Sequence, residues 1–329
     1  MLSKSGYTEH NLDHFILELR LKSLFSLSKG GKSTTQVGIS FDEERVAVAI
    51  ANHATNPPTI NKILTLPSEK TLKATLQKAM KKARVTDAEA VFALKVHETK
   101  FHKIQKPNIP AEERENSLLF LMKDRLSQTV DNSLVACVDY PEGSRHDDQL
   151  MVFEASKPRI AALVDAADSA DIKLSAIDVA ELLYGDLIFS EEDMHKGVGF
   201  LIEHDTGVHL LLYRDHSLYL IRRLQDISDL VSCLPLSGNE NAADSLLLEV
   251  QRTLDYYDSL MGQPMPAMLY MIPSMIDLSP LAEHLDSSLT PSVTLLDINR
   301  MFDLPEALDY ATQHDAVVAV AASLRRVHS

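Results

Sequence analysis

A repeated order of secondary-structure elements constrains the fold of this chain more than any other feature of its sequence. Apolar, β-prone runs at residues 37–39, 46–51 and 59–66 are separated by short polar turns, which predicts three antiparallel strands. Residues 72–83 then place apolar side chains on one face of a helix, and residues 90–94 form a short apolar strand.

The same order occurs again from residue 198. Runs at 198–202, 208–213 and 217–224 are followed by a predicted helix over 242–261 and a strand over 267–272. Alternating strands and helices after an antiparallel meander predict a mixed sheet with helices on its faces. Two such units with a cleft between them indicate an α/β, two-lobed actin-like (ribonuclease H-like) fold with duplicated mixed sheets.

A small α+β insert interrupts the first unit. Residues 100–105, 134–139 and 149–154 are strand-like, and residues 110–125 are predicted to form a helix. The expected division is therefore a leader and linker over 1–36, a first lobe over 37–97 with 157–195, an insert over 98–156, and a second lobe over 196–329.

Charge is spread unevenly along the chain, whose net charge is −15. Residues 1–110 hold 17 Lys or Arg against 10 Asp or Glu, and the rest holds 15 against 37. Such an acidic chain is a poor binder of nucleic acid. The basic first third suits an anionic membrane surface or an acidic partner, and a solvated lysine face on one helix explains it equally well. No run is apolar enough for a membrane helix.

Several segments carry a family resemblance. Residues 175–187 read SAIDVAELLYGDL, residues 199–224 read GFLIEHDTGVHLLLYRDHSLYLIRRL, and residues 246–262 read LLLEVQRTLDYYDSLMG. With VGI at 37–39 and AVVAVAASLRR at 316–326, they resemble the PilM-like family of type IV pilus assembly proteins. The resemblance is strongest to its MshI branch, which serves mannose-sensitive haemagglutinin (MSHA) pilus biogenesis.

This resemblance implies an actin-like fold related to the cell-division protein FtsA. It also implies a cytoplasmic position at the inner face of the inner membrane, with peripheral association only. The implied partner is a PilN-like, MshJ-type inner-membrane protein whose cytoplasmic N-terminal segment is bound; the pilus motor ATPase and platform protein are further implied partners. A GspL-like type II secretion module is a second alternative, although GspL proteins continue into a membrane helix.

Active members of the fold wrap ATP phosphates with two turns rich in small residues, and an acid at each turn positions Mg²⁺. The family's first turn reads Asp-hydrophobic-Gly-Ser-Ser. The matching positions here are Ser40, Phe41, Asp42, Glu43 and Glu44. The metal-positioning acid is thus a serine, and three consecutive acids would repel a polyphosphate.

The second turn reads Glu203, His204, Asp205, Thr206 and Gly207. Glu203 can still serve as a metal acid, and Thr206 and Gly207 stay small, but Asp205 stands where glycine is expected. The adenosine turn lacks its Gly-Gly pair. We therefore predict a pseudo-ATPase with no catalytic residue, no metal site and no cofactor. ATP and Mg²⁺ are expected only under the alternative of an active actin-like ATPase switch.

The histidines near this turn do not indicate a metal site. His204 and His209 are five residues apart, so on a regular strand they face opposite sides. We interpret them as polar residues of a hairpin.

The insert helix contains five consecutive apolar residues, 118–122. A helix packed on one side needs only an apolar stripe, so this patch predicts burial on two sides. In the PilM-like family the partner peptide lies in a groove between the first lobe and the insert. The hypothesis is that such a groove is bordered by Phe101, Ile104, Leu118, Leu119, Phe120 and Met122. Burial of the second face by the adjoining lobe is an equal alternative.

Overall fold

The computed structural model describes residues 34–41, 44–85, 88–204, 206–234, 240–259 and 261–326. Its first sheet has the strand order β3-β2-β1-β4-β8. The first three strands pair antiparallel, and β4 and β8 join in parallel. The bounds are β1 (Thr35–Phe41), β2 (Arg45–Asn52), β3 (Thr59–Pro67), β4 (Glu89–Leu94) and β8 (Lys173–Val179).

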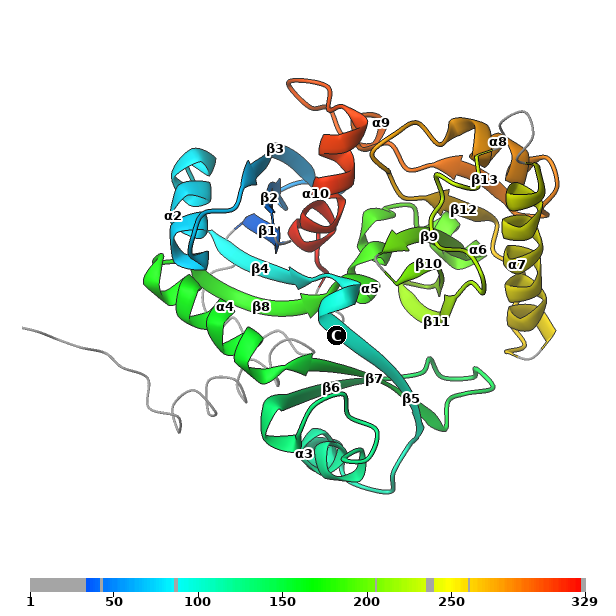
Figure 1. The fold of residues 1–329 in the computed structure, drawn as a ribbon, viewed down its shortest axis with the longest axis horizontal. Helices are drawn as coiled ribbons and strands as arrows, with labels where there is room; N and C mark the ends of the chain where they lie inside the picture. Colours follow the sequence, from blue (N-terminus) through cyan, green and yellow to red (C-terminus); the bar gives the residue numbers. More distant parts are fainter. Residues whose placement is uncertain are drawn as a thin grey trace, which may run out of the picture.

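The second sheet repeats this arrangement with the order β11-β10-β9-β12-β13. Again three strands pair antiparallel and two more join in parallel. The predicted duplicated mixed sheets are therefore confirmed, and Figure 1 shows them in two separate lobes. The bounds are β9 (Val198–His204), β10 (Gly207–Arg214), β11 (Ser217–Arg223), β12 (Met268–Met271) and β13 (Ser292–Leu295).

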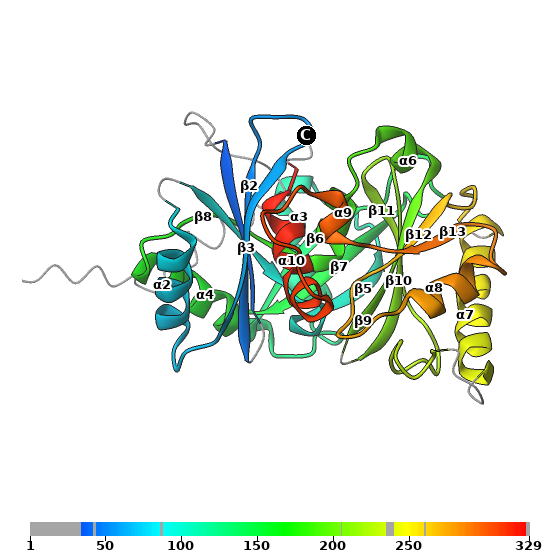
Figure 2. The ribbon, with the colours of Figure 1, turned by 90° about the horizontal axis from the view of Figure 1, so that it is seen from above.

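Helices cover both faces of the first sheet. Helices α2 and α4 lie on its outer face, and α10 lies between the two sheets (Figure 2). Helices α7 and α8 lie on the outer side of the second lobe. The helix bounds are α2 (Leu72–Ala83), α4 (Lys157–Ser169), α5 (Ala180–Leu183), α6 (Glu191–Lys196), α7 (Glu240–Ser259), α8 (Ser279–Asp286), α9 (Ile298–Met301) and α10 (Tyr310–Ser323), with short 3₁₀ turns η1 (Val96–Glu98), η2 (Val130–Asn132) and η3 (Tyr184–Leu187).

Helix α10 packs directly on β1. A Cβ atom at Gly38 would lie 2.0 Å from the carbonyl oxygen of Ala319, so only glycine permits this approach. In β2, Ala49 and Ala47 pair with Gly38 and Ser40, so the side chains on that face of the sheet are small. Small side chains thus let the helix backbone come close to the strand.

The position of α10 differs from the expected division of the chain, which assigned residues 196–329 to the second lobe. The helix packs mainly on β1, β2 and β4 of the first sheet, and His314 also contacts the loop after β12 of the second. The side chain of Gln36 in β1 donates to the carbonyl oxygen of Ala322, 3.0 Å away. The order of elements alone does not say which of two similar sheets a terminal helix will cover.

The insert is a three-stranded antiparallel sheet, ordered β5-β7-β6, with one helix on one face. Its bounds are β5 (Thr99–Gln105), α3 (Ala111–Leu121), β6 (Ser133–Asp139) and β7 (Gln149–Ser156). Helix α3 ends four residues before the predicted end at 125. A small separate core joins the helix to the sheet and consists of Leu118, Met122, Val135, Cys137, Leu150 and Val152.

Within the described residues, no helix combines the length and the apolar character needed to cross a bilayer.

Candidate functional site

The candidate nucleotide site lies where the carboxyl ends of parallel strands meet between the lobes. The loops after β4 and β12, the end of β9 and one side of α10 surround a cavity of about 220 Å³. Sites at the carboxyl ends of strands are the usual binding positions in open α/β sheets. The cavity is lined in part by His97, Glu203, His204, Ser274 and His314.

His204 is the histidine most changed by this environment. Burial, and then the nearby His209 and other potential cations, lower the pKa of His204 to about 3. Its Nε2 atom has no hydrogen-bond partner among the residues that the structure describes. The imidazole is therefore neutral at physiological pH and brings no positive charge to the cavity.

The prediction that His204 and His209 face opposite sides is wrong. Their ring centroids are 5.2 Å apart, with the ring planes at 68°. The two residues are in neighbouring strands of one hairpin, and His209 lies opposite Ile202 in the register. Residues 202 and 204 share a face of β9, so the hairpin brings His209 to the same face.

Glu203 has a structural partner. Its Oε2 atom accepts a hydrogen bond from the backbone N–H of Leu230, 3.0 Å away, and so holds the loop that follows β11. Thr206 is exposed in the turn. Gly207 has φ +113°, and a Cβ there would lie 2.9 Å from the carbonyl oxygen of Ile227. Glycine at this position is therefore required by the backbone. Asp205 lies outside the described residues.

The described residues of the first predicted phosphate turn, Ser40, Phe41 and Glu44, are not among those that line the cavity. Ser40 is buried, and its hydroxyl has no hydrogen-bond partner in the part of the chain that is described. Glu44 is exposed, and its carbonyl oxygen accepts from the backbone N–H of Ser68. Asp42 and Glu43 lie outside the described residues.

One side of the cavity is closed by α10. The carbonyl oxygen of Pro273 lies 2.9 Å from Nδ1 of His314, which ties the loop after β12 to the helix. Val317 and Val318 of the same helix form an apolar wall. Among the residues described, no three His, Cys, Asp or Glu side chains are grouped so that they could hold a metal ion.

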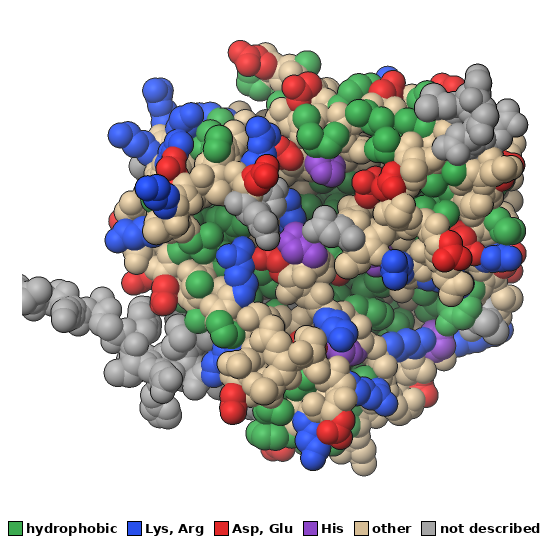
Figure 3. All heavy atoms as spheres, in the orientation of Figure 1, with side chains coloured by type: hydrophobic (Ala, Val, Ile, Leu, Met, Phe, Trp, Pro, Cys, Tyr) green, Lys and Arg blue, Asp and Glu red, His purple; other side chains and the backbone are tan. Residues whose placement is uncertain are grey.

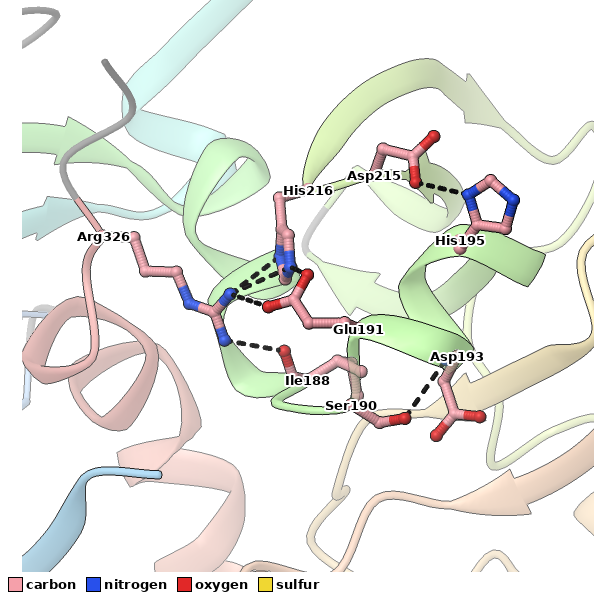
Figure 4. A network of polar contacts seen from close by, with 8 residues as sticks. All are labelled: Ile188, Ser190, Glu191, Asp193, His195, Asp215, His216 and Arg326. Atoms are coloured by element: carbon pink, nitrogen blue, oxygen red, sulfur yellow. Dashed lines mark hydrogen bonds and ion pairs between the residues drawn. The ribbon is translucent and has the colours of Figure 1, made fainter. Parts of the chain in front are cut away.

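Two arginines after α10 connect the lobes, and sequence reasoning missed them. The Nε atom of Arg325 donates to Asp178 at the end of β8, 2.6 Å away. The guanidinium of Arg326 contacts Glu191 of α6 and His216 of the second lobe, and it donates to the carbonyl oxygen of Ile188 at 3.2 Å (Figure 4). The available signal was the paired arginines directly after an apolar helix.

A buried carboxyl group, that of Asp186, lies beside these two arginines. Asp186 accepts a hydrogen bond from the backbone N–H of Arg326, 3.2 Å away. Burial raises the pKa of Asp186 to about 8, although the Arg326 hydrogen bond and charge oppose this shift. Burial also raises the pKa of the nearby Glu181 to about 7. The junction between the lobes therefore contains two acids that favour their neutral form.

The predicted partner-binding residues divide into three groups. Leu118 and Met122 are buried in the small core of the insert, with Leu119 and Ile104 packed against it. Phe101 is on the other face of the insert sheet, where its ring lies 5.6 Å from that of Phe153.

Phe120 is the one predicted partner-binding residue that is exposed, at 66%, and the neighbouring Leu121 is 62% exposed. The alternative that the adjoining lobe buries the second face of the helix is therefore wrong for these two side chains. The six predicted residues do not border a single surface, because Phe101 and Ile104 alternate along β5 and point to opposite faces.

No protein-family model matches the chain, and no curated protein matches it. Solved structures do match. A chain of a PilM–PilN type IV pilus biogenesis complex aligns with a TM-score of 0.62 at 18% identity, covering 89% of this chain and 99% of that one. The cytoplasmic domain of EpsL, from the type II secretion system of Vibrio cholerae, aligns with a TM-score of 0.48 at 10% identity, covering 89% and 96%. The actin-like fold predicted from the sequence is confirmed.

Proposed function

We propose that this chain is a non-catalytic, MshI-like scaffold of MSHA-type pilus assembly. It lies at the cytoplasmic face of the inner membrane and binds the cytoplasmic N-terminal segment of a PilN-like, MshJ-type membrane protein. The fold shared with a chain of the PilM–PilN complex, over 89% of this chain, supports the proposal. The resemblance of residues 175–187, 199–224 and 246–262 to the PilM-like family supports it independently.

The main support for a non-catalytic role is the environment of the interlobe cavity. Its volume of about 220 Å³ is below the ~300–1,000 Å³ typical of small-molecule sites. His204 is neutral, and Glu203 is held by Leu230. A magnesium-bound triphosphate needs cations or free backbone N–H groups around its oxygens. Lys95 supplies one cation to the lining, but the small volume, the neutral His204 and the carboxylate of Glu203 count against a magnesium-bound triphosphate.

The exposed end of α3 is the surface that we assign to the partner. Phe120 and Leu121 project from a helix whose other apolar residues already fill the core of the insert. Large apolar side chains with no structural use in the monomer are typical anchors of protein interfaces. The peptide groove of the PilM-like family is also bordered by the insert, which agrees with this position.

Calorimetric titration tests both parts of the proposal on one sample. The purified chain is titrated first with Mg-ATP and then with a synthetic peptide of the PilN-like partner's N-terminal segment. We expect no heat from the nucleotide and saturable binding of the peptide. Micromolar nucleotide binding would overturn the first part and favour an ATPase switch. A folded chain that does not bind the peptide would overturn the second part.

A further inference from the structure

One segment of this acidic protein has a large net positive charge. Residues 45–84 contain eight Lys or Arg and a single acid, Glu69. The whole chain has 32 basic and 47 acidic residues, so everything outside this segment holds 24 against 46. The segment has a net charge of +7 and the rest of the chain −22. Figure 3 shows the basic side chains gathered over α2 and β3, at the upper left of that view.

Five of these cations converge on a single shallow depression, which we call the α2–β3 basic surface. The depression has a volume of about 560 Å³ and one apolar lining residue, Leu64. The cations come from the second half of α2, its C-cap and the edge strand β3, and they are Lys62, Lys78, Lys81, Lys82 and Arg84.

Little neutralises this surface within the protein. Lys78 forms an ion pair with Glu69, and Lys62 donates to the carbonyl oxygen of Lys82 at 2.8 Å. Lys81, Lys82 and Arg84 have no carboxylate partner among the residues that the structure describes. The helix dipole favours cations in the last turn of α2, which accounts for Lys81 and Lys82. It does not account for the approach of Lys62 from another element.

We propose that the α2–β3 basic surface docks this protein directly on an anionic phospholipid bilayer. Clusters of four to eight cations on an amphipathic helix are typical of surfaces that bind acidic lipid headgroups. The cations are spread along α2 and the neighbouring edge strand, so they match a plane of phosphates better than one compact anion. The segregation of the two charge signs also orients the chain, because the acidic remainder is repelled by the same membrane.

Partner binding is not needed for this inference, so the chain alone can test it. The probe is a set of vesicles of mixed phosphatidylcholine and phosphatidylglycerol, with pure phosphatidylcholine vesicles as the neutral comparison. We expect co-sedimentation with the anionic vesicles only, and its loss in high salt because the contact is screened. Equal binding to both vesicle types, or to neither, would overturn the proposal; the second outcome would redirect the surface to an acidic protein partner.

A triple variant locates the contact. Lys81→Gln and Lys82→Gln keep good helix formers on exposed positions. Arg84→Asn suits the C-cap, whose φ of 57° is left-handed, a conformation that asparagine tolerates. At about 1 kcal/mol for each basic residue near the surface, we expect vesicle binding to weaken on the order of 100-fold.

A matched control removes the same charge elsewhere. Lys100, Lys123 and Arg125 are exposed on the insert, and their change to Gln should leave vesicle binding close to that of the unchanged chain. An equal loss in both triple variants would show that net charge alone decides binding and would overturn the assignment to α2 and β3. The binding of the partner peptide to the K81Q/K82Q/R84N variant should be unchanged, which separates this inference from the proposed function.

Discussion

The two lobes have the same strand order but fill their interiors in different ways. In the first sheet, Gly38 of β1 admits the backbone of α10, and small residues in the neighbouring strand keep that face low. In the second sheet, the ring of Phe200 in β9 lies within 6 Å of three other aromatic rings. A fold can thus be duplicated while one copy packs by close backbone approach and the other by interlocking rings.

The glycines at matching places in the two inner strands make the difference explicit. A Cβ at Gly38 would meet backbone atoms of Ala319 and Ser323, at 2.0 and 2.3 Å. A Cβ at Gly199 would meet mainly the side-chain ends of Leu269 and Leu212, at 2.5 and 2.7 Å. Side-chain ends can move to other rotamers, whereas a packed helix must move as a whole.

The largest expected effect follows from this contrast. Gly38→Ala should destabilise the protein by more than the ~1–3 kcal/mol of ordinary overpacking, because α10 must leave the sheet. Gly199→Ala should stay within that range. Thermal unfolding of the two variants measures the difference. Similar losses in both would mean that α10 tolerates displacement and would break the proposed contrast between the lobes.

The second prediction concerns the rings of the second lobe. Phe200→Leu removes aromatic contacts with Tyr184, Tyr213 and Tyr270, whose ring centroids lie 5.9, 5.5 and 5.7 Å away. At ~0.5–1.5 kcal/mol for each pair, the free energy of unfolding should fall by about 2–4 kcal/mol.

A first-lobe control sharpens the measurement of that loss. Phe92→Leu removes one such pair, with Phe41 at 5.5 Å, and should cost less. Chemical denaturation compares the two variants. If Phe92→Leu is the more damaging change, aromatic packing is not what distinguishes the second lobe.

The sequence predicted the duplication well because it depends on local patterns. Polar turns and strand-like runs are visible in one dimension, and so are the departures of both phosphate turns from the family pattern. The packing of α10 on the first sheet was not predictable in this way. Residues 316–322 of this helix are apolar on all sides, so periodicity indicates burial without indicating against which sheet.

The candidate partner surface was predicted only in part, for the same reason. Five consecutive apolar residues indicated that helix α3 has two apolar faces, and two of the side chains are indeed exposed. The spacing of three residues between Phe101 and Ile104 places them on opposite faces of a strand, but which layer covers each face depends on contacts with distant segments. The contacts of Arg325 and Arg326 between the lobes join segments that are distant in the sequence. The pair of arginines itself was the only local signal of them.

The third prediction tests the junction that joins the two lobes. The folded state raises the pKa of Asp186 from its ordinary value to about 8, so it binds a proton that the unfolded chain releases at lower pH. Stability from this group is therefore full in acid and is lost as pH rises toward 8.

Asp186→Asn replaces the carboxyl group by an amide, which is neutral at every pH and can still accept the hydrogen bond from Arg326. Relative to the unchanged chain, it should gain roughly 3 kcal/mol of stability between pH 5 and pH 8. Unfolding curves of both proteins across this range measure the gain. A constant difference at all pH values would show that Asp186 does not control the junction.

The smallest expected effect on stability, and the most specific effect on function, concerns the insert that only the first lobe contains. Phe120→Glu replaces a side chain that is 66% exposed, so the free energy of unfolding should change by less than ~0.5 kcal/mol. Leu248→Glu on α7 of the second lobe is the matched control, because Leu248 is 50% exposed and gains the same charge.

If α3 anchors the partner, Phe120→Glu should weaken peptide binding at least ~10-fold in calorimetry, since a buried aromatic anchor is replaced by a charge. The control should bind as the unchanged chain does. Equal affinity of the two variants would move the partner site away from this helix. Because both substitutions leave the packing of either sheet untouched, such a result would leave the contrast between the lobes standing while removing the function assigned to the insert.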